Sequence, residues 1–171
     1  TQTILELKRI PLIAGEYKIT LTLHDLANPA ADVYKDSIVI ESPQHNPFLS
    51  GLQLIDTAIM VEGSSQNPFL RNNKLQFPMC AAFMDEGRKS IQFYAEAYTN
   101  PQSSTALFSH VFISKKEMGA PIHNLSKNDT LTHAAIHPIS GSISLRTLPS
   151  GNYYLNIVLQ DSMNKHLSQR A

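Results

Sequence analysis

Apolar and polar residues alternate with a period of two along most of the chain. In the stretch YKITLTLH, residues 17–24, every odd position is apolar and every even position is polar. Such alternation predicts a β-strand with one buried face. The same pattern predicts strands at residues 3–10, 15–26, 36–42, 51–60, 75–83, 90–99, 106–116, 132–139, 141–148 and 152–161. A helical period is missing, apart from a short turn expected around residues 115–120.

Segments rich in turn-forming residues separate these predicted strands. They are residues 27–32, 42–51, 62–73, 84–90, 99–104 and 124–129, and the ISGSIS stretch at 139–144 predicts a further hairpin turn. About ten short strands at such spacing are typical of two packed antiparallel sheets. The sequence therefore predicts an all-β protein, an antiparallel β-sandwich of immunoglobulin-like type.

The stretch SPQHNPFLSG, residues 42–51, contains two prolines and no alternation. It predicts a linker at residues 44–50, with a second β-sandwich at residues 51–171. Only about three strands precede the linker, too few to bury two sheet faces. Residues 1–43 are therefore interpreted as the closing strands of a truncated first β-sandwich.

Two stretches of the chain resemble each other. LIAGEYKITLTLHD, residues 12–25, aligns without gaps with LPSGNYYLNIVLQD, residues 148–161, at an offset of 136 (148 − 12). A strand that follows a glycine turn can look like this by chance. The matched Gly, Tyr and Asp positions favour the other interpretation, in which both copies are the same late strand of two successive sandwiches and the chain is a fragment.

Composition excludes several classes of function. Lys plus Arg and Asp plus Glu number 14 each, so the net charge is zero and no basic surface for nucleic acid is expected. No apolar run reaches the 18 residues that suggest a membrane-spanning segment. Cys80 is the single cysteine, so it forms no intrachain disulfide, and within the apolar run FPMCAAF it is expected to be a buried small residue.

Candidate catalytic chemistry is sparse. His133 and His137 are four residues apart and would share one face of a strand, but no third ligand completes a metal set. His110 is expected to share the core side of its strand with Phe108 and Phe112. Serine occurs in neither a GxSxG nor an SxxK motif. We therefore predict no enzyme, no catalytic residue, no bound cofactor and no metal.

Five aromatic residues are candidates for interaction. Phe48 and Phe69 each end an NPF turn and would either plug the ends of the sandwich or form exposed knobs for another domain or protein. Tyr94, Tyr98 and Tyr154 are the candidates for a carbohydrate-binding surface if they face outward.

Several stretches together resemble a known family: AGEYKITLTLHDLANP, LSGLQLIDTAIM, FLRNNKLQFPM, IQFYAEAYTN and LPSGNYYLNIVLQDSMNK. Their order and spacing are similar to those in the bacterial GWxTD domain-containing proteins, exported proteins of the Gram-negative cell envelope with tandem sandwich-like segments. The motif itself is absent, because the chain contains no Trp. The resemblance implies a periplasmic or outer-membrane-associated location and no particular activity.

These observations favour a non-catalytic structural or protein-interaction module of an exported envelope protein. Its partners would be other envelope proteins or neighbouring domains of the same chain, bound in part by strand pairing. The alternative from a different class is a carbohydrate-binding module.

Overall fold

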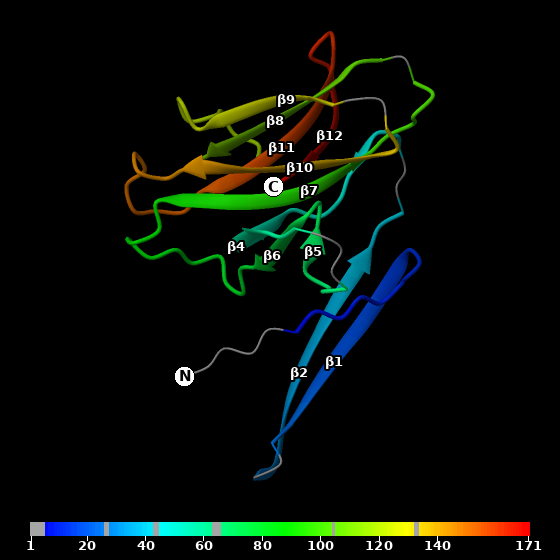
Figure 1. Cartoon of the computed structure of the whole chain (residues 1–171), viewed down its shortest axis with the longest axis vertical. Helices are drawn as coiled ribbons and strands as arrows, with labels where there is room; N and C mark the ends of the chain where they lie inside the picture. The colour runs from blue at the N-terminus through cyan, green and yellow to red at the C-terminus, as the bar shows by residue number, and fades with distance from the viewer. Residues whose placement is uncertain (1–5, 26–27, 43–44, 63–65, 104, 132–133) are drawn as a thin grey trace. The chain divides into compact units, whose positions relative to one another are not determined.

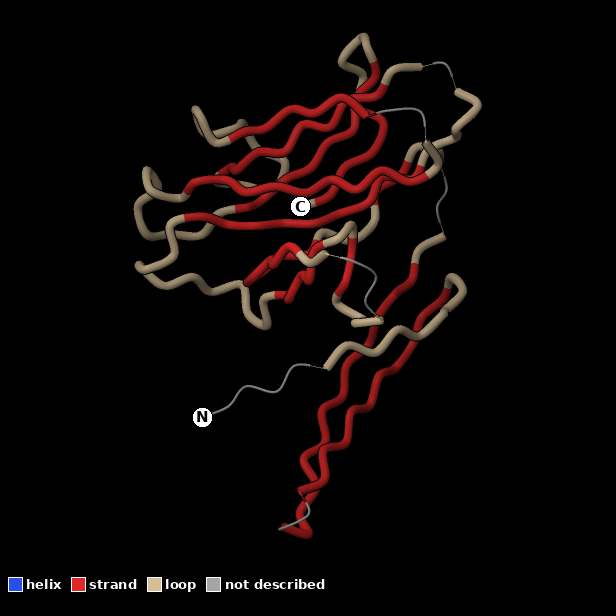
Figure 2. Tube along the Cα trace, in the orientation of Figure 1, coloured by secondary structure: helices blue, strands red, loops and turns tan. Residues whose placement is uncertain are grey.

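The computed structural model describes residues 6–25, 28–42, 45–62, 66–103, 105–131 and 134–171. The described residues form strands, turns and loops (Figures 1 and 2). They include no helix long and apolar enough to cross a membrane. The chain divides into two compact units, residues 1–44 and residues 45–171.

The first unit is built on a long antiparallel hairpin. Strand β1 (Gly15–Asp25) pairs with β2 (Asn28–Ile40), with Gly15 opposite Ile40 and Leu23 opposite Asp32. Cross-strand partners share a face, so one face gathers most of the large apolar residues of both strands, while Val33 and Val39 lie on the other face. This set, called the hairpin face below, comprises Tyr17, Ile19, Leu21, Leu23, Tyr34, Ile38 and Ile40, with Asp32 and Asp36 among them.

The second unit contains two antiparallel sheets. The first has the order β10-β7-β4-β6-β5, and β3 also pairs with β7. Its strands are β3 (Phe48–Leu49), β4 (Gln53–Met60), β5 (Leu70–Arg71), β6 (Lys74–Pro78), β7 (Ser90–Tyr98) and β10 (Ile136–Ser144). The second sheet has the order β12-β11-β8-β9. Its strands are β8 (Leu107–Ser114), β9 (Ser126–Leu131), β11 (Tyr154–Asp161) and β12 (His166–Arg170).

The core of the second unit lies between these sheets, as expected for a β-sandwich. One layer comes from alternate residues of β7 and β10, including Ile91, Phe93 and Ile139, and the other from β8 and β11, including Val111 and Ile157. Leu49 of β3 belongs to the same core. The predicted all-β sandwich is thereby confirmed for this unit.

Residues 44–50 were expected to be a linker, but their second half belongs to the second unit. Phe48 and Leu49 pair with Tyr98 and Ala97 of β7, and Ser50 exchanges backbone and side-chain hydrogen bonds with Glu96. Three residues later the chain rejoins β7 as β4. The sandwich therefore begins earlier than residue 51.

Several predicted elements differ from the structure. Of the strand expected at residues 3–10, residues 6–10 form no strand, and residues 3–5 lie outside the described part. The strand expected at 75–83 ends at Pro78. The expected loop at 124–129 contains the start of β9, an edge strand of mostly polar residues. The expected loop at 27–32 contains the start of β2. The turn around residues 115–120 is present, with Gly119 N donating to Lys116 O at 2.9 Å.

The hairpin turn predicted in ISGSIS is wrong, because β10 runs straight through it. Gly141 lies opposite Phe93 of β7, and a Cβ at this glycine would come within 3.1 Å of the Phe93 ring. A glycine within a strand often marks such a close approach rather than a turn. The aromatic ring occupies the space that a side chain would fill.

Candidate functional site

Both copies of the repeat form the same local structure at the start of a strand. The Tyr17 hydroxyl donates to Ile13 O at 2.9 Å, and the Tyr153 hydroxyl donates to Pro149 O at 2.8 Å, four residues back in each case. The intervening glycines have φ of 156° at Gly15 and 158° at Gly151. In each copy the tyrosine ring lies against the glycine, with Cε2 at 3.6 Å from where a Cβ would stand.

This arrangement is a tyrosine corner, a feature of immunoglobulin-type sandwiches at the start of a strand that follows a crossover between sheets. In the second unit the corner lies between β10 of one sheet and β11 of the other. Each corner is followed by a strand that forms an antiparallel hairpin with the next strand, β11 with β12 and β1 with β2. The two copies of the repeat therefore share their hydrogen-bonding pattern as well as their sequence.

The two copies differ in what covers them. In β11, Leu155, Ile157 and Leu159 are 9, 0 and 0% exposed. The aligned residues of β1, Ile19, Leu21 and Leu23, are 41, 52 and 60% exposed. Residues of the same type and position are therefore core in one copy and surface in the other.

The difference follows from the neighbours of each strand. One edge of β11 pairs with β12, the other pairs with β8, and its apolar face packs into the core of the sandwich. Among the described residues, β1 pairs with β2 alone. The hairpin face and the second edge of β1 are the features that we select as the candidate functional site, an interaction surface rather than a catalytic one.

Two of the five predicted aromatic residues, Tyr94 and Tyr98, lie on the side of β7 away from the core and are held by the same carboxylate. The Tyr94 and Tyr98 hydroxyls donate to Glu96 Oε1 and Oε2 at 2.6 and 2.5 Å. Burial and the Glu96 hydrogen bond raise the pKa of Tyr94 to about 12, and the Glu96 hydrogen bond raises the pKa of Tyr98. The Arg71 guanidinium lies 5.0 Å from the Tyr94 ring centre.

These contacts leave little of Tyr94 and Tyr98 for a sugar. Tyr94 is only 4% exposed. One face of Tyr98 is occupied by Phe48, whose ring is stacked at 4.7 Å between centroids and 5° between planes. Tyr154, at the start of β11, is an exposed aromatic, and the structure does not bring it together with Tyr94 and Tyr98, which lie on the other sheet.

The two NPF phenylalanines pack against other aromatic rings. Phe48 covers Tyr98, and Phe69 is nearly buried against Phe77 of β6, with ring centroids 5.1 Å apart. Neither side chain forms an exposed knob, and neither belongs to the core cluster between the two sheets. That they plug the ends of the sandwich stays a prediction.

The histidines do not assemble into a reactive centre in the described part of the chain. His137 is buried, with Nε2 at 2.8 Å from Ala134 O and 3.3 Å from Thr99 Oγ1. His133 lies outside the described residues. No group of three or more His, Cys, Asp or Glu side chains that could hold a metal ion is found among the described residues.

The placement of His110 corrects a prediction. Ser109, Val111 and Ile113 form the buried face of β8 toward the core, so His110 and Phe112 share the other face, with ring centroids 4.7 Å apart. Partial burial, together with the charge of His166, lowers the pKa of His110. The prediction failed because both faces of β8 carry large apolar residues, so alternation alone did not identify the core side.

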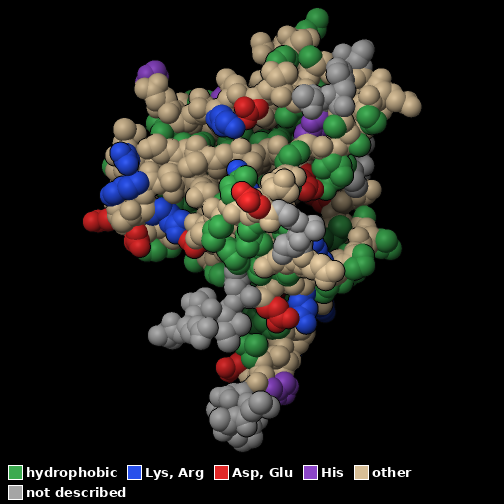
Figure 3. All heavy atoms as spheres, viewed as in Figure 1, with side chains coloured by type: hydrophobic (Ala, Val, Ile, Leu, Met, Phe, Trp, Pro, Cys, Tyr) green, Lys and Arg blue, Asp and Glu red, His purple; other side chains and the backbone are tan. Residues whose placement is uncertain are grey.

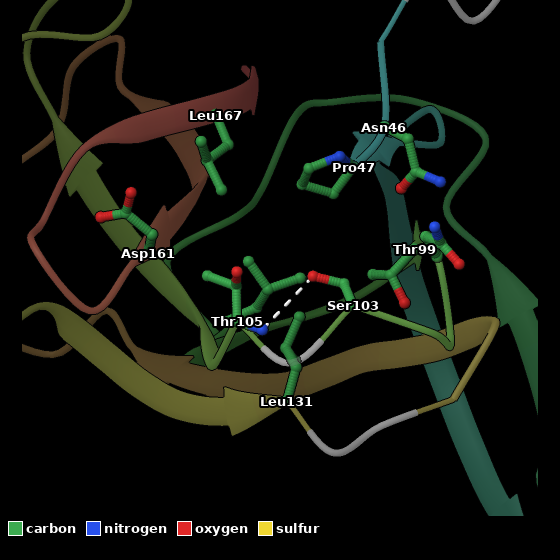
Figure 4. Close-up of a pocket in the computed structure, with 10 residues that line it drawn as sticks. Asn46, Pro47, Thr99, Ser103, Thr105, Leu131, Asp161 and Leu167 are labelled. Atoms are coloured by element: carbon green, nitrogen blue, oxygen red, sulfur yellow. Dashed lines mark hydrogen bonds between the residues drawn. The ribbon is translucent and has the colours of Figure 1, made fainter.

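A cavity of about 360 Å³ lies at one end of the sandwich, where the loops after β7 and β11 meet (Figure 4). Among the described residues its lining is mixed, with Asn46, Thr99, Ser103 and Asp161 and without a histidine. The Asp161 Oδ1 atom accepts hydrogen bonds from the backbone N–H groups of Met163 and Lys165 at 2.8 and 2.9 Å. That oxygen of the carboxylate therefore serves the β11–β12 turn.

The expectation that Cys80 is buried is wrong. Cys80 is exposed in the loop after β6, in the same run as Phe83, which is 81% exposed. The strand ends at Pro78, and the apolar run then continues on the surface. Pro78 itself was the available signal, because proline removes a ladder donor and is often found at strand edges or ends.

Charge adds no binding site on the face visible in Figure 3, where basic and acidic side chains are interspersed.

Comparisons of the chain with models of known protein families, with curated proteins and with solved structures give no match.

Proposed function

We propose that this protein is a non-catalytic structural and protein-interaction module of an exported bacterial cell-envelope protein. The observation that carries the proposal is the hairpin face, on which Ile19, Leu21 and Leu23 are exposed although their counterparts in β11 are core. A contiguous exposed apolar surface on a folded protein marks a site of interaction. Strand β1 is an edge strand within the described part of the chain, and an edge strand can add directional backbone pairing to that attraction.

The envelope location is supported by the sequence. The run of segments that resembles GWxTD domain-containing proteins spans both units, and the charged fraction of the chain is 16%, below the usual value of about 25%. Polar uncharged side chains make up the difference.

A photocrosslinking experiment in bacteria that carry the complete natural protein tests the proposal. The photoreactive residue p-benzoylphenylalanine replaces Leu21 in one variant and Lys18 in a control variant. Both positions are exposed on β1, but Lys18 lies on the opposite face from Leu21. We expect protein crosslinks from position 21 that are at least several times stronger than those from position 18, in the envelope fraction.

Equal crosslinking from the two positions would contradict an interaction through the hairpin face. Recovery of the protein in the cytoplasmic fraction would contradict the envelope location.

A further inference from the structure

We propose that the β1–β2 hairpin is the closing hairpin of a second β-sandwich, and that the remaining strands of that sandwich lie ahead of Thr1 in the same polypeptide. This inference rests on the proposed function and names the partner of the hairpin face. The partner is an incomplete sandwich that lacks its tyrosine-corner hairpin.

The first step is the equivalence of the two hairpins. At one offset of 136, Gly15 matches Gly151, Tyr17 matches Tyr153 and Leu21 matches Ile157. Both tyrosines bond to the carbonyl four residues back, and both strands then pair with the strand that follows. A tyrosine corner is formed where a chain crosses between the sheets of a sandwich. The corner at Tyr17 therefore indicates a sandwich around β1 as well.

The second step is the nature of the missing neighbour. Beside β11, the antiparallel strand β8 places Ile113 opposite Leu155, Val111 opposite Ile157 and Ser109 opposite Leu159. In the first copy of the repeat, the residues equivalent to Leu155, Ile157 and Leu159 are Ile19, Leu21 and Leu23. A strand equivalent to β8 would therefore place its residues opposite these three. The edge of β1 away from β2, which pairs with no other strand of the described residues, is thus suited to an antiparallel strand with apolar side chains opposite Ile19 and Leu21. A facing sheet equivalent to β7 and β10 would cover the rest of the hairpin face.

The third step is the position of that neighbour in the polypeptide. All the strands that surround β11, except its hairpin partner β12, come before it in the chain. By the same order, the strands that surround β1 would precede it. The later strands β7, β8 and β10 already pair with β11 or pack against it in the core of the second unit. They are therefore not available to surround β1.

A second copy of the chain fits the face less well. Its own β1 could pair antiparallel along this edge, with apolar residues opposite Ile19 and Leu21, whereas another edge such as β9 carries mostly polar residues. Even the β1 pairing would only join two hairpins into one sheet and would supply no facing sheet, so the hairpin faces of both copies would stay uncovered.

The crosslinked product from position 21 of the complete natural protein distinguishes the possible partners. After digestion, mass spectrometry identifies the joined peptides, and the intact mass shows whether one or two chains are linked. We expect a link within one chain, to a peptide ahead of Thr1 with alternating apolar residues. Hydrogen exchange is expected to be at least about tenfold slower at residues 19–23 in the natural protein than in residues 1–171 alone.

A link between two copies, or to a different protein, would overturn this inference but leave the proposed interaction function standing. A natural polypeptide that begins at Thr1 would also overturn it. Absence of any position-dependent link, together with unchanged hydrogen exchange, would overturn both the inference and the proposed function.

Discussion

Ile157 and Leu21 occupy the same position in the two copies of the repeat, yet one is fully buried and the other is 52% exposed. Ile157→Ala and Leu21→Ala therefore form a matched pair of substitutions. Each removes about three carbon atoms from the same side of an equivalent strand. The two variants differ in the surroundings that the lost atoms leave behind.

The expected magnitudes follow from burial. Three buried carbon groups at about 0.8 kcal/mol each give about 2.4 kcal/mol of lost transfer free energy for Ile157→Ala. The cavity left between β11 and the facing sheet brings the expected loss to about 3–4 kcal/mol. At Leu21 about half of the side chain is already in water, so the transfer loss is about 1 kcal/mol at most and no cavity forms. That loss belongs to the hairpin, and we expect the unfolding free energy of residues 45–171 to change by less than about 0.5 kcal/mol.

Urea unfolding of the chain, followed by far-ultraviolet circular dichroism, measures the difference. With an m-value of about 1.5 kcal/mol per molar urea, Ile157→Ala should lower the midpoint of the main transition by about 2–2.7 M, and Leu21→Ala by less than about 0.4 M. Equal shifts for the two variants would refute the view that only the second copy is covered.

Three further predictions concern single side chains. The buried Asn156 accepts a hydrogen bond from the backbone N–H of Met118 at its Oδ1 atom, at 2.8 Å. Asn156→Ala removes this acceptor and should lower the unfolding free energy by about 2–3 kcal/mol in the same urea assay. An unchanged unfolding free energy would argue against a stabilising role of this hydrogen bond. The pKa of Tyr94 is about 12, above the ordinary 10.0, so its contribution to stability is complete below pH 10 and is lost as the pH rises toward 12. Absorbance titration at about 295 nm should show that Tyr94→Phe reduces the amplitude of the late tyrosine ionisation near pH 12, while the raised ionisation of Tyr98 remains, and an unchanged amplitude would refute the assignment. Cys80 should react fully with a thiol reagent without denaturant, and a requirement for denaturant would show that the thiol is buried.

Much of the fold of residues 45–171 could be predicted from alternation. The stretches around β4, β7, β8 and β11 were predicted as strands, because a strand with one buried face requires a period of two. Strand β9 was missed, since its residues are mostly polar and its place in the sheet depends on pairing with β8. Gly141 was misinterpreted, because only the Phe93 ring across the sheet explains a glycine there.

The candidate site was predictable in part. The repeat of Gly15 and Tyr17 at Gly151 and Tyr153 indicated that the two segments are the same element. The structure agrees, because each tyrosine hydroxyl donates to the carbonyl four residues back. The five aromatic candidates gave no common surface. Their positions depend on which sheet carries them and on the contacts with Glu96, Phe77 and one another.

The sequence by itself determined that this protein is made of strands with alternating apolar and polar residues, and that one strand with a Gly and a Tyr at its start occurs twice. Only the tertiary structure decided that Ile157 is core while Leu21 is surface. The physical reason is that a period of two separates the faces of a strand through local geometry. Burial depends on neighbours that distant segments supply. Strand β11 has β8 beside it and the facing sheet above it, whereas β1 pairs with β2 alone within the described chain.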